Sequence, residues 1–218
     1  STPSAADMAT DTELRNALAP LRSVASFMMT GAHPDDEASA LLARLARKDG
    51  LRTIYVCATR GQGGQNTLGP ESGDALAAIR TREMEEAARV LDMEVHWLDL
   101  PDFGFAKTAE ATLTVWGEER LLEGLVRAIR TTRPDVICPT FLDVPGQHGH
   151  HRAITRATIS AFDLAADPDA FSEQIAAGLP AWRAAKLYLP AISGGGGTYD
   201  DAEPPPPETV SVALDSAD

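Results

Sequence analysis

The chain has 218 residues, of which 44% are hydrophobic and 23% charged, and its formal net charge at pH 7 is −13. This composition is typical of a globular protein with one sizeable domain, and no apolar run approaches the ~20 residues that a membrane span needs. The negative charge argues against a nucleic-acid partner, because phosphate backbones attract clustered Lys and Arg.

The two cysteines, Cys57 and Cys138, each lie in an apolar run and are interpreted as reduced core residues. Together with the absence of a charged-then-apolar leader, this favours a cytoplasmic location. Because the chain begins at Ser1, an exported form with a missing leader stays open.

Short apolar runs alternate with amphipathic segments along the chain. The spacing predicts strands over 27–32, 51–57, 95–100, 135–140 and 186–191. It predicts helices over 38–49, which Gly50 ends, and over 74–91, about 118–131 and about 151–166. This alternation indicates an α/β fold with a doubly wound, mostly parallel, Rossmann-like sheet flanked by helices.

Three parts of the chain are expected. Residues 1–24 form an N-terminal extension or helix, residues 25–192 form the α/β domain, and residues 193–218 form a Gly/Pro-rich linker or long loop. The last part includes a possible strand at 209–214, and the chain could continue past Asp218.

Two motifs that contain histidine follow predicted strands, and the first also contains three acidic residues. The stretch GAHPDDE (31–37) follows the first strand and GQHGHH (146–151) follows the fourth. The loops TRGQGGQN (59–66) and LPDFGF (100–105) follow the second and third. Because ligands bind at the carboxyl ends of the strands in such sheets, these four loops should meet at one edge and form the site, with 104–117 and 167–185 as parts of its rim.

The spacing His33-x-x-Asp36 allows an imidazole and a carboxylate to face one centre. A third ligand from 148–151 would complete a two-histidine, one-carboxylate set with an open position, which is a catalytic zinc arrangement. Zinc lowers the pKa of a bound water to about 7, and Asp35 is placed to take the proton of that water. A second histidine of the downstream group would stabilise the oxyanion or protonate the leaving group.

Structural roles are the alternative to each of these assignments. His33 could be a hydrogen-bonded core histidine, and the downstream histidines could be a surface cluster. The acidic residues 35–37 could cap a helix, which is the favoured role for Glu37 and is compatible with metal binding by Asp36. The metal site is favoured because both motifs occupy matching strand ends.

The AHPDDE sequence resembles the signature of the LmbE-like (PIG-L) family of zinc-dependent N-deacetylases. IRTREMEEAARVLD (79–92) is similar to the arginine-containing helix of that family, and TRGQGG and LPDFGF are similar to its second-strand and third-strand loops. The resemblance extends from about residue 25 to residue 165. It implies an LmbE-like fold with a zinc ion as the cofactor.

By position, the resemblance implies that His33, Asp36 and His151 bind Zn²⁺, that Asp35 is the general base, and that His148 is the oxyanion or acid partner. Arg80, Asp102 and His150 are the expected substrate-binding residues. The chain departs from the His-Pro-Asp-His pattern of the family, because His150 replaces the aspartate. The choice between His150 and His151 as third ligand therefore stays open. Gln62, at a position often occupied by Glu, is a second departure.

The expected function is that of a zinc-dependent amidohydrolase that removes an acetyl group from an N-acetylated amino sugar or its conjugate. The partner is then a small N-acetyl-sugar molecule. One alternative is a non-catalytic carbohydrate-binding domain of a larger protein. The other is a non-haem iron oxygenase, which uses a similar ligand triad. The sequence names neither the specific substrate nor the oligomeric state.

Overall fold

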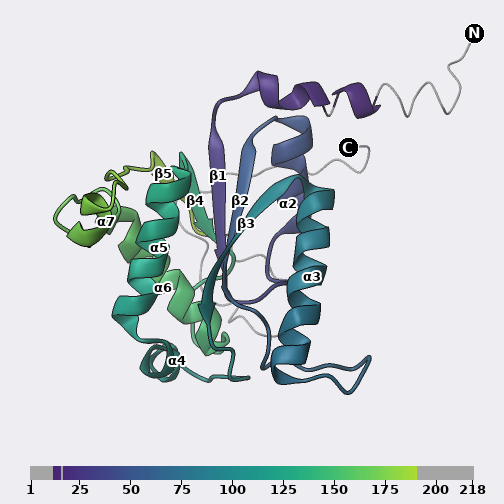
Figure 1. The fold of residues 1–218 in the computed structure, drawn as a ribbon, viewed down its shortest axis with the longest axis vertical. Helices are drawn as coiled ribbons and strands as arrows, with labels where there is room; N and C mark the ends of the chain where they lie inside the picture. Colours follow the sequence, from purple (N-terminus) through teal and green to yellow (C-terminus); the bar gives the residue numbers. More distant parts are fainter. Residues whose placement is uncertain (1–11, 16, 191–218) are drawn as a thin grey trace, which may run out of the picture.

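A computed structural model describes residues 12–15 and 17–190 of the chain (Figure 1). The expected linker over 193–218 and its possible strand at 209–214 lie outside these residues, as do residues 1–11 of the expected N-terminal extension. Ahead of the first strand, the expected N-terminal extension contains a short 3₁₀-helix, η1 (Ala19–Arg22). Within the part of the chain that is described, every helix is too short or too polar to cross a bilayer.

The five strands form one parallel sheet, as the alternating pattern predicted. They are β1 (Ser26–Gly31), β2 (Arg52–Thr59), β3 (Met93–Leu100), β4 (Val136–Pro139) and β5 (Lys186–Leu187). Their order in the sheet is β3-β2-β1-β4-β5, and all neighbouring pairs are parallel. The predicted strands are confirmed to within a few residues, although β5 is much shorter than 186–191.

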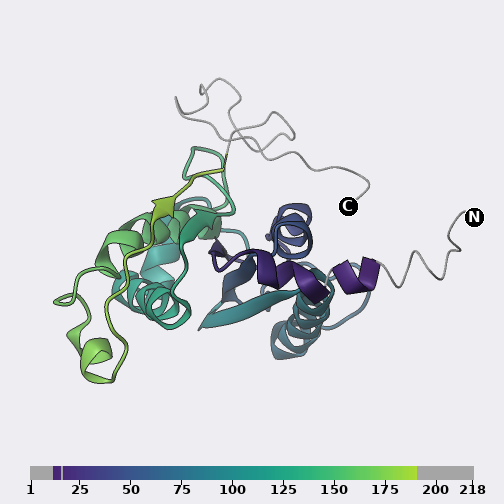
Figure 2. The ribbon, with the colours of Figure 1, turned by 90° about the horizontal axis from the view of Figure 1, so that it is seen from above.

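Helices cover both faces of this sheet (Figure 2). The covering helices are α2 (Ser39–Ala43), which continues as the π-helical turn η2 (Arg44–Lys48), α3 (Gly73–Leu91), α4 (Ala109–Trp116), α5 (Glu118–Thr132) and α6 (Gly149–Leu164). A short further helix, α7 (Ser172–Ala176), lies at the outer edge of the molecule (Figure 1). Gly50 follows the first of the covering helices with φ +74°, as expected of a residue that ends a helix. The helix α4 was not predicted. It begins at Thr108, whose hydroxyl accepts a hydrogen bond from the Ala111 N–H.

The alternation of side chains along the strands divides the core into two layers. Met28 and Ile54 point to the face covered by α4, α5 and α6. Phe27, Met29 and Tyr55 point to the opposite face, where α2 and α3 pack. The fold is therefore the expected doubly wound α/β architecture with three layers.

The strand order places a topological switch point between β1 and β4. From β1 the chain builds outward through β2 and β3, and then it returns to the other side of β1 to build β4 and β5. The connections leaving β1 and β4 consequently turn to opposite faces of the sheet and leave a crevice at the carboxyl ends of these two strands. Both histidine motifs emerge at this crevice.

The segment 167–185 lies at the other end of the sheet. The Trp182 indole donates a hydrogen bond to the Pro134 carbonyl at 2.7 Å, and the Ala185 N–H donates to the Asp135 carbonyl at 2.8 Å. Both carbonyls precede β4, so this segment packs at the amino ends of the strands. The expectation that it forms part of the rim of the site is therefore wrong.

Arg130 fixes this distal segment to α5. Its buried guanidinium donates to main-chain carbonyls of the segment that follows α6, and the shortest of these bonds, at 2.7 and 2.8 Å, reach Asp167 and Ala170. It also reaches the side-chain oxygen of Gln174 at 3.3 Å. A single side chain thus satisfies carbonyls that would otherwise be buried without a donor.

We expect Arg130→Lys to lower the free energy of unfolding by about 2 kcal/mol, because an ammonium cannot reach the same set of carbonyls. Arg127→Lys is the matched control. Arg127 lies one turn earlier on α5 and pairs with Glu123 at the surface, so its replacement should change stability by less than about 0.5 kcal/mol. Equal effects of the two variants in urea unfolding would contradict this assignment.

Asp143 ties the loop after β4 to α6. Its carboxylate accepts hydrogen bonds from Arg152, at 2.6 Å, and from Arg156. Burial raises the pKa of Asp143, but the two guanidinium groups lower it by more, so the net pKa lies below its ordinary value. The group therefore stabilises the fold at neutral pH, and this contribution is lost as the pH falls below the unfolded-state pKa of about 3.9.

We expect Asp143→Asn to lower the free energy of unfolding by about 1 kcal/mol at pH 7. The difference from the wild type should shrink as the pH falls below about 4, because the wild-type carboxylate is then protonated in the unfolded chain. Asp163→Asn is the control. Asp163 lies at an exposed position of α6, so its replacement should change stability by less than about 0.5 kcal/mol. A difference that persists at pH 2 would contradict the electrostatic origin.

Candidate metal centre

A cleft of about 310 Å³ opens at the carboxyl ends of the strands. It is lined by the loops after β1, β2 and β3, by α3 and by the start of α6, through residues His33, Pro34, Asp35, Gly61, Gly63, Gly64, Gln65, Leu76, Arg80, Asp102, Gly104, Phe105 and His148. A second cleft, of about 540 Å³, lies at the amino ends, and the described residues that line it include no histidine or cysteine. The histidines that line a cleft, His33 and His148, therefore belong to the first.

The main chain after β1 is held by the neighbouring strand β2. The Tyr55 hydroxyl donates to the His33 carbonyl at 2.7 Å, and Thr59 donates to the Ala32 carbonyl through both its N–H and its hydroxyl. Gly31 makes room for this arrangement, since a Cβ there would lie 2.1 Å from the Tyr55 hydroxyl oxygen. These contacts fix the position from which the His33 side chain extends.

The Asp36 carboxylate folds back onto the loop that carries it. Its Oδ2 accepts the N–H groups of Ala32 and His33 at 2.9 and 2.8 Å and lies 3.3 Å from His33 Nδ1. Its Oδ1 lies 3.2 Å from His151 Nε2. Burial raises the pKa of Asp36, but hydrogen bonds and charge from His151 and His33 outweigh it and hold the pKa far below its ordinary value. The group is therefore an anion at neutral pH.

The Asp36 carboxylate also affects His33. Burial lowers the pKa of His33, but the carboxylate of Asp36 raises it by more, so the net pKa lies above the ordinary value.

His151 comes from the first turn of α6, on the opposite side of the crevice. Its Nδ1 lies 2.8 Å from Gln147 Oε1, which also accepts the His148 N–H at 2.7 Å. An atom that accepts a main-chain N–H is the amide oxygen, so His151 donates from Nδ1 and its Nε2 carries the lone pair. The imidazole also stacks on Phe141, with ring centroids 4.1 Å apart.

His33, Asp36 and His151 each offer one ligand atom, and these atoms all lie within 4.8 Å of one another. A carboxylate oxygen 3.2 Å from an imidazole lone pair is repulsive unless a proton or a cation lies between them. Two imidazoles and a carboxylate are a donor set that divalent zinc and its neighbours in the first transition row accept. The residues present therefore fit a metal ion, and the cluster could hold one.

Asp35 and Arg80 line the cleft beside this cluster. Arg80 extends from α3 and pairs with Asp35 at 2.8 Å and with Glu83 at 2.8 Å. It also donates to the Pro34 carbonyl at 3.3 Å. The Asp35 side chain is 65% exposed, so its carboxylate is oriented by Arg80 and still open to a ligand in the cleft.

His148 is the residue before α6, and it caps that helix. Its Nδ1 accepts the His150 N–H at 3.0 Å, so the neutral ring carries its hydrogen on Nε2. Burial, followed by the nearby His33 and His151, lowers the pKa of His148 to about 4. The start of α6 is fixed by the loop after β3. The Gly149 N–H donates to the Ala106 carbonyl at 2.7 Å, and a Cβ on Gly149 would lie 2.2 Å from the Thr108 carbonyl oxygen.

His150 and Asp102 lie deeper than expected of substrate contacts. His150 is fully buried, packs against Trp116 and Phe103, and does not line the cleft. Burial lowers its pKa to about 3, with further lowering from His33 and His148. Asp102 lines the cleft but is largely buried, and its Oδ1 accepts the Gly104 N–H at 3.0 Å. The structure thus brings all eight predicted site residues together. Some of them line the cleft, and others, such as His150, are buried beneath it.

Sequence reasoning missed Gln147 and Phe105. Gln147 is buried against two histidines of the site, and its position four residues before His151 was the available signal, since such residues are neighbours across one helical turn. Phe105 is 71% exposed at the wall of the cleft. An exposed aromatic side chain in a predicted site loop could have been read as a ligand contact. Glu37, favoured as a helix cap, makes no side-chain cap bond to α2 and instead accepts from the Ser39 hydroxyl.

Comparison with known proteins identifies relatives of the chain. The family model PIG-L, described as GlcNAc-PI de-N-acetylase, matches residues 28–162. A mycothiol S-conjugate amidase from Streptomyces coelicolor is 32% identical over 67% of this chain and 55% of its own length. A 1D-myo-inositol 2-acetamido-2-deoxy-alpha-D-glucopyranoside deacetylase from Frankia alni is 33% identical over 74% of this chain and 61% of its own. The chain thus spans little more than half the length of these relatives.

Solved structures share the fold at lower identity. An N,N'-diacetylchitobiose deacetylase from Pyrococcus horikoshii superposes with a TM-score of 0.61 at 23% identity, covering 88% of this chain and 70% of that one. GalB, a 4-carboxy-2-hydroxymuconate hydratase from Pseudomonas putida, also gives 0.61, at 18% identity and covering 76% and 65%. Since these two carry different activities, their likeness supports the fold alone. The family match extends from β1 to α6 and includes every residue of the metal cluster, and on it the chain belongs to the PIG-L family.

Proposed function

We propose that the protein is a metal-dependent amidohydrolase that removes an acetyl group from an N-acetylated amino sugar or its conjugate. The observation that carries this proposal is the convergence of His33, Asp36 and His151 beside a cleft that also presents Asp35 and His148. Membership of the PIG-L family supports it, as do relatives named as deacetylases and an amidase of GlcNAc-containing or mycothiol-derived substrates.

His33, Asp36 and His151 would hold the ion, and zinc is the proposed one because two imidazoles and one carboxylate with an open position are a common catalytic zinc set. When bound, the ion supplies Lewis acidity, which polarises the amide carbonyl and makes a water acidic enough to act as nucleophile near neutral pH. The buried carboxylate of Asp36 balances part of the charge of the cation.

The other residues of the cleft would handle protons and orientation. Asp35, held by Arg80 at 2.8 Å, would take the proton of the attacking water and later deliver it to the departing amine. His148 carries its hydrogen on Nε2, because its Nδ1 already accepts the His150 N–H. It would therefore donate to the oxygen of the tetrahedral intermediate. Phe105, which is exposed at the wall of the cleft, would contact the sugar, as would the small part of Asp102 that lines the cleft.

The direct test measures acetate release from a panel of N-acetylglucosamine conjugates, with and without a chelator. We expect release from at least one conjugate, its loss after chelation, and its recovery when Zn²⁺ is added back. Zinc-loaded protein that binds a conjugate without releasing acetate would contradict the proposal and favour a carbohydrate-binding domain. Release that survives complete removal of the metal would contradict the role of the cluster.

Asp35→Asn should lower kcat by about 10²–10⁴-fold, the usual contribution of a positioned general base. The exposed ion pair with Arg80 contributes less than about 1 kcal/mol to stability, so the thermal midpoint should change little. Asp74→Asn is the matched control, at an exposed position in the first turn of α3 outside the cleft, and it should keep wild-type turnover. An Asp35→Asn variant with undiminished kcat would rule out this base.

A further inference from the structure

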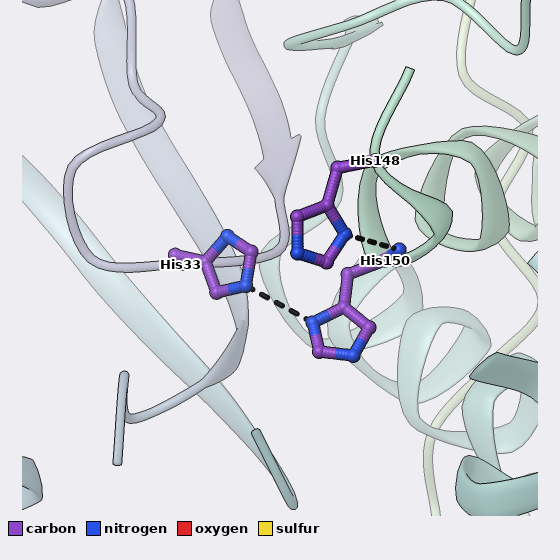
Figure 3. A group of neighbouring side chains, drawn as sticks. All are labelled: His33, His148 and His150. Atoms are coloured by element: carbon purple, nitrogen blue, oxygen red, sulfur yellow. Dashed lines mark hydrogen bonds between the residues drawn. The ribbon is translucent and has the colours of Figure 1, made fainter. Parts of the chain in front are cut away.

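The three imidazoles of His33, His148 and His150 lie together (Figure 3), each offering a nitrogen within 4.8 Å of the others. His33 and His148 line the cleft, and His150 lies beneath it. They could form a metal site of their own, but one nitrogen of each ring already has a hydrogen-bond partner within the group, while His150 Nε2 is buried without one. His148 Nδ1 accepts the His150 N–H at 3.0 Å, and His150 Nδ1 lies 3.0 Å from His33 Nε2. The existing hydrogen bonds point to a different role for this group.

His33 uses its two ring nitrogens in different directions. Its Nδ1 faces Asp36 and His151, at 3.3 Å from each, and this is the nitrogen that would meet an ion. Its Nε2 faces His150 Nδ1. A histidine that binds a metal through one nitrogen keeps the hydrogen on the other, and that outer N–H needs an acceptor. His150 Nδ1 is that acceptor.

His151 shows the same arrangement with its nitrogens exchanged. Its Nε2 faces Asp36 at 3.2 Å, and its Nδ1 donates to Gln147 Oε1 at 2.8 Å. Both acceptors are buried, and both are carried by the start of α6. His150 accepts through the lone pair of its Nδ1, and Gln147 accepts through its amide oxygen, which carries no charge.

We infer that His150 and Gln147 are the positioning residues that set which nitrogen of His33 and His151 faces the ion. This inference rests on the proposed function, because it concerns the same metal cluster. It also accounts for the departure of the chain from the His-Pro-Asp-His pattern. A neutral imidazole at position 150 preserves the acceptor and removes a carboxylate from a site that already buries Asp36. Burying one anion fewer lowers the desolvation cost of the site.

Metal affinity tests the inference without reference to turnover. The full chain is stripped with a chelator and titrated with Zn²⁺ against a chromophoric competitor. Replacing an outer acceptor should weaken Zn²⁺ binding by about 10–100-fold. We expect this loss in Gln147→Leu and recovery to within a few-fold in Gln147→Glu, which restores an oxygen acceptor. His150→Phe should lose affinity likewise, and His150→Asn should retain most of it.

His96→Phe is the matched control, since His96 lies on β3 outside both clefts, and it should bind Zn²⁺ as the wild type does. Circular dichroism of each metal-free variant checks that it is folded. If His150→Phe does not fold, the comparison of Gln147→Leu with Gln147→Glu provides the test. Affinities within 2-fold of the wild type for both Gln147→Leu and His150→Phe would overturn the inference. Two zinc ions per wild-type chain, falling to one in His150→Asn, would overturn it too, because the three imidazoles would then be a metal site.

These outcomes are separate from those of the proposed function. Tight Zn²⁺ binding that follows the predicted order among the variants, without acetate release from any conjugate, would uphold the positioning roles and refute the deacetylase. Acetate release that requires the metal, together with a Zn²⁺ affinity that replacements at positions 147 and 150 leave unchanged, would uphold the deacetylase and refute the positioning roles.

Discussion

The buried carboxylate of Asp36 is the constraint on which the site depends. An anion removed from water needs compensation, and here it comes from the main-chain N–H groups of Ala32 and His33 and from the imidazoles of His33 and His151. Three of these four groups belong to the loop after β1, and the fourth belongs to α6, which lies far along the chain. The loop thus supplies most of the compensation itself, and the docking of α6 completes both the compensation of Asp36 and the cluster.

Much of the fold follows from patterns that the sequence displays openly. Five apolar runs separated by amphipathic stretches predict a parallel sheet, and the place of each polar loop then follows from the direction of the strands. The sequence did not predict the helix α4, because it is short and follows a stretch of turn residues. It also did not predict the position of 167–185, because this segment is held by Arg130. No local pattern distinguishes this arginine from the exposed Arg127 on the same helix. A buried charge whose partners are main-chain carbonyls leaves no sequence signal.

The composition of the site was more predictable than its layering. The motifs at the ends of β1 and β4 were enough to place six side chains in one crevice, and the resemblance to a family added Arg80 and Asp102. They could not tell that His150 lies beneath the cleft, because that depends on packing against Trp116 and Phe103, which come from other elements. Nor could they tell which nitrogen of each imidazole faces the cluster. That property is set by single hydrogen bonds, and it is visible only when all the partners have coordinates.

The close approach of Gly149 to the loop before α4 has a consequence for how members of this fold can diversify. With the Ala106 carbonyl bonded to the Gly149 N–H and the Thr108 carbonyl where a methyl group would otherwise lie, the base of that loop and the first turn of α6 are joined as one rigid block. Exchanges of the exposed Phe105 side chain can reshape the mouth of the cleft. Changes in the backbone at Ala106 or Thr108 would displace the first turn of α6 and its histidines. New specificities should therefore arise by exchange of the side chain at position 105, with the segment bonded to Gly149 unchanged.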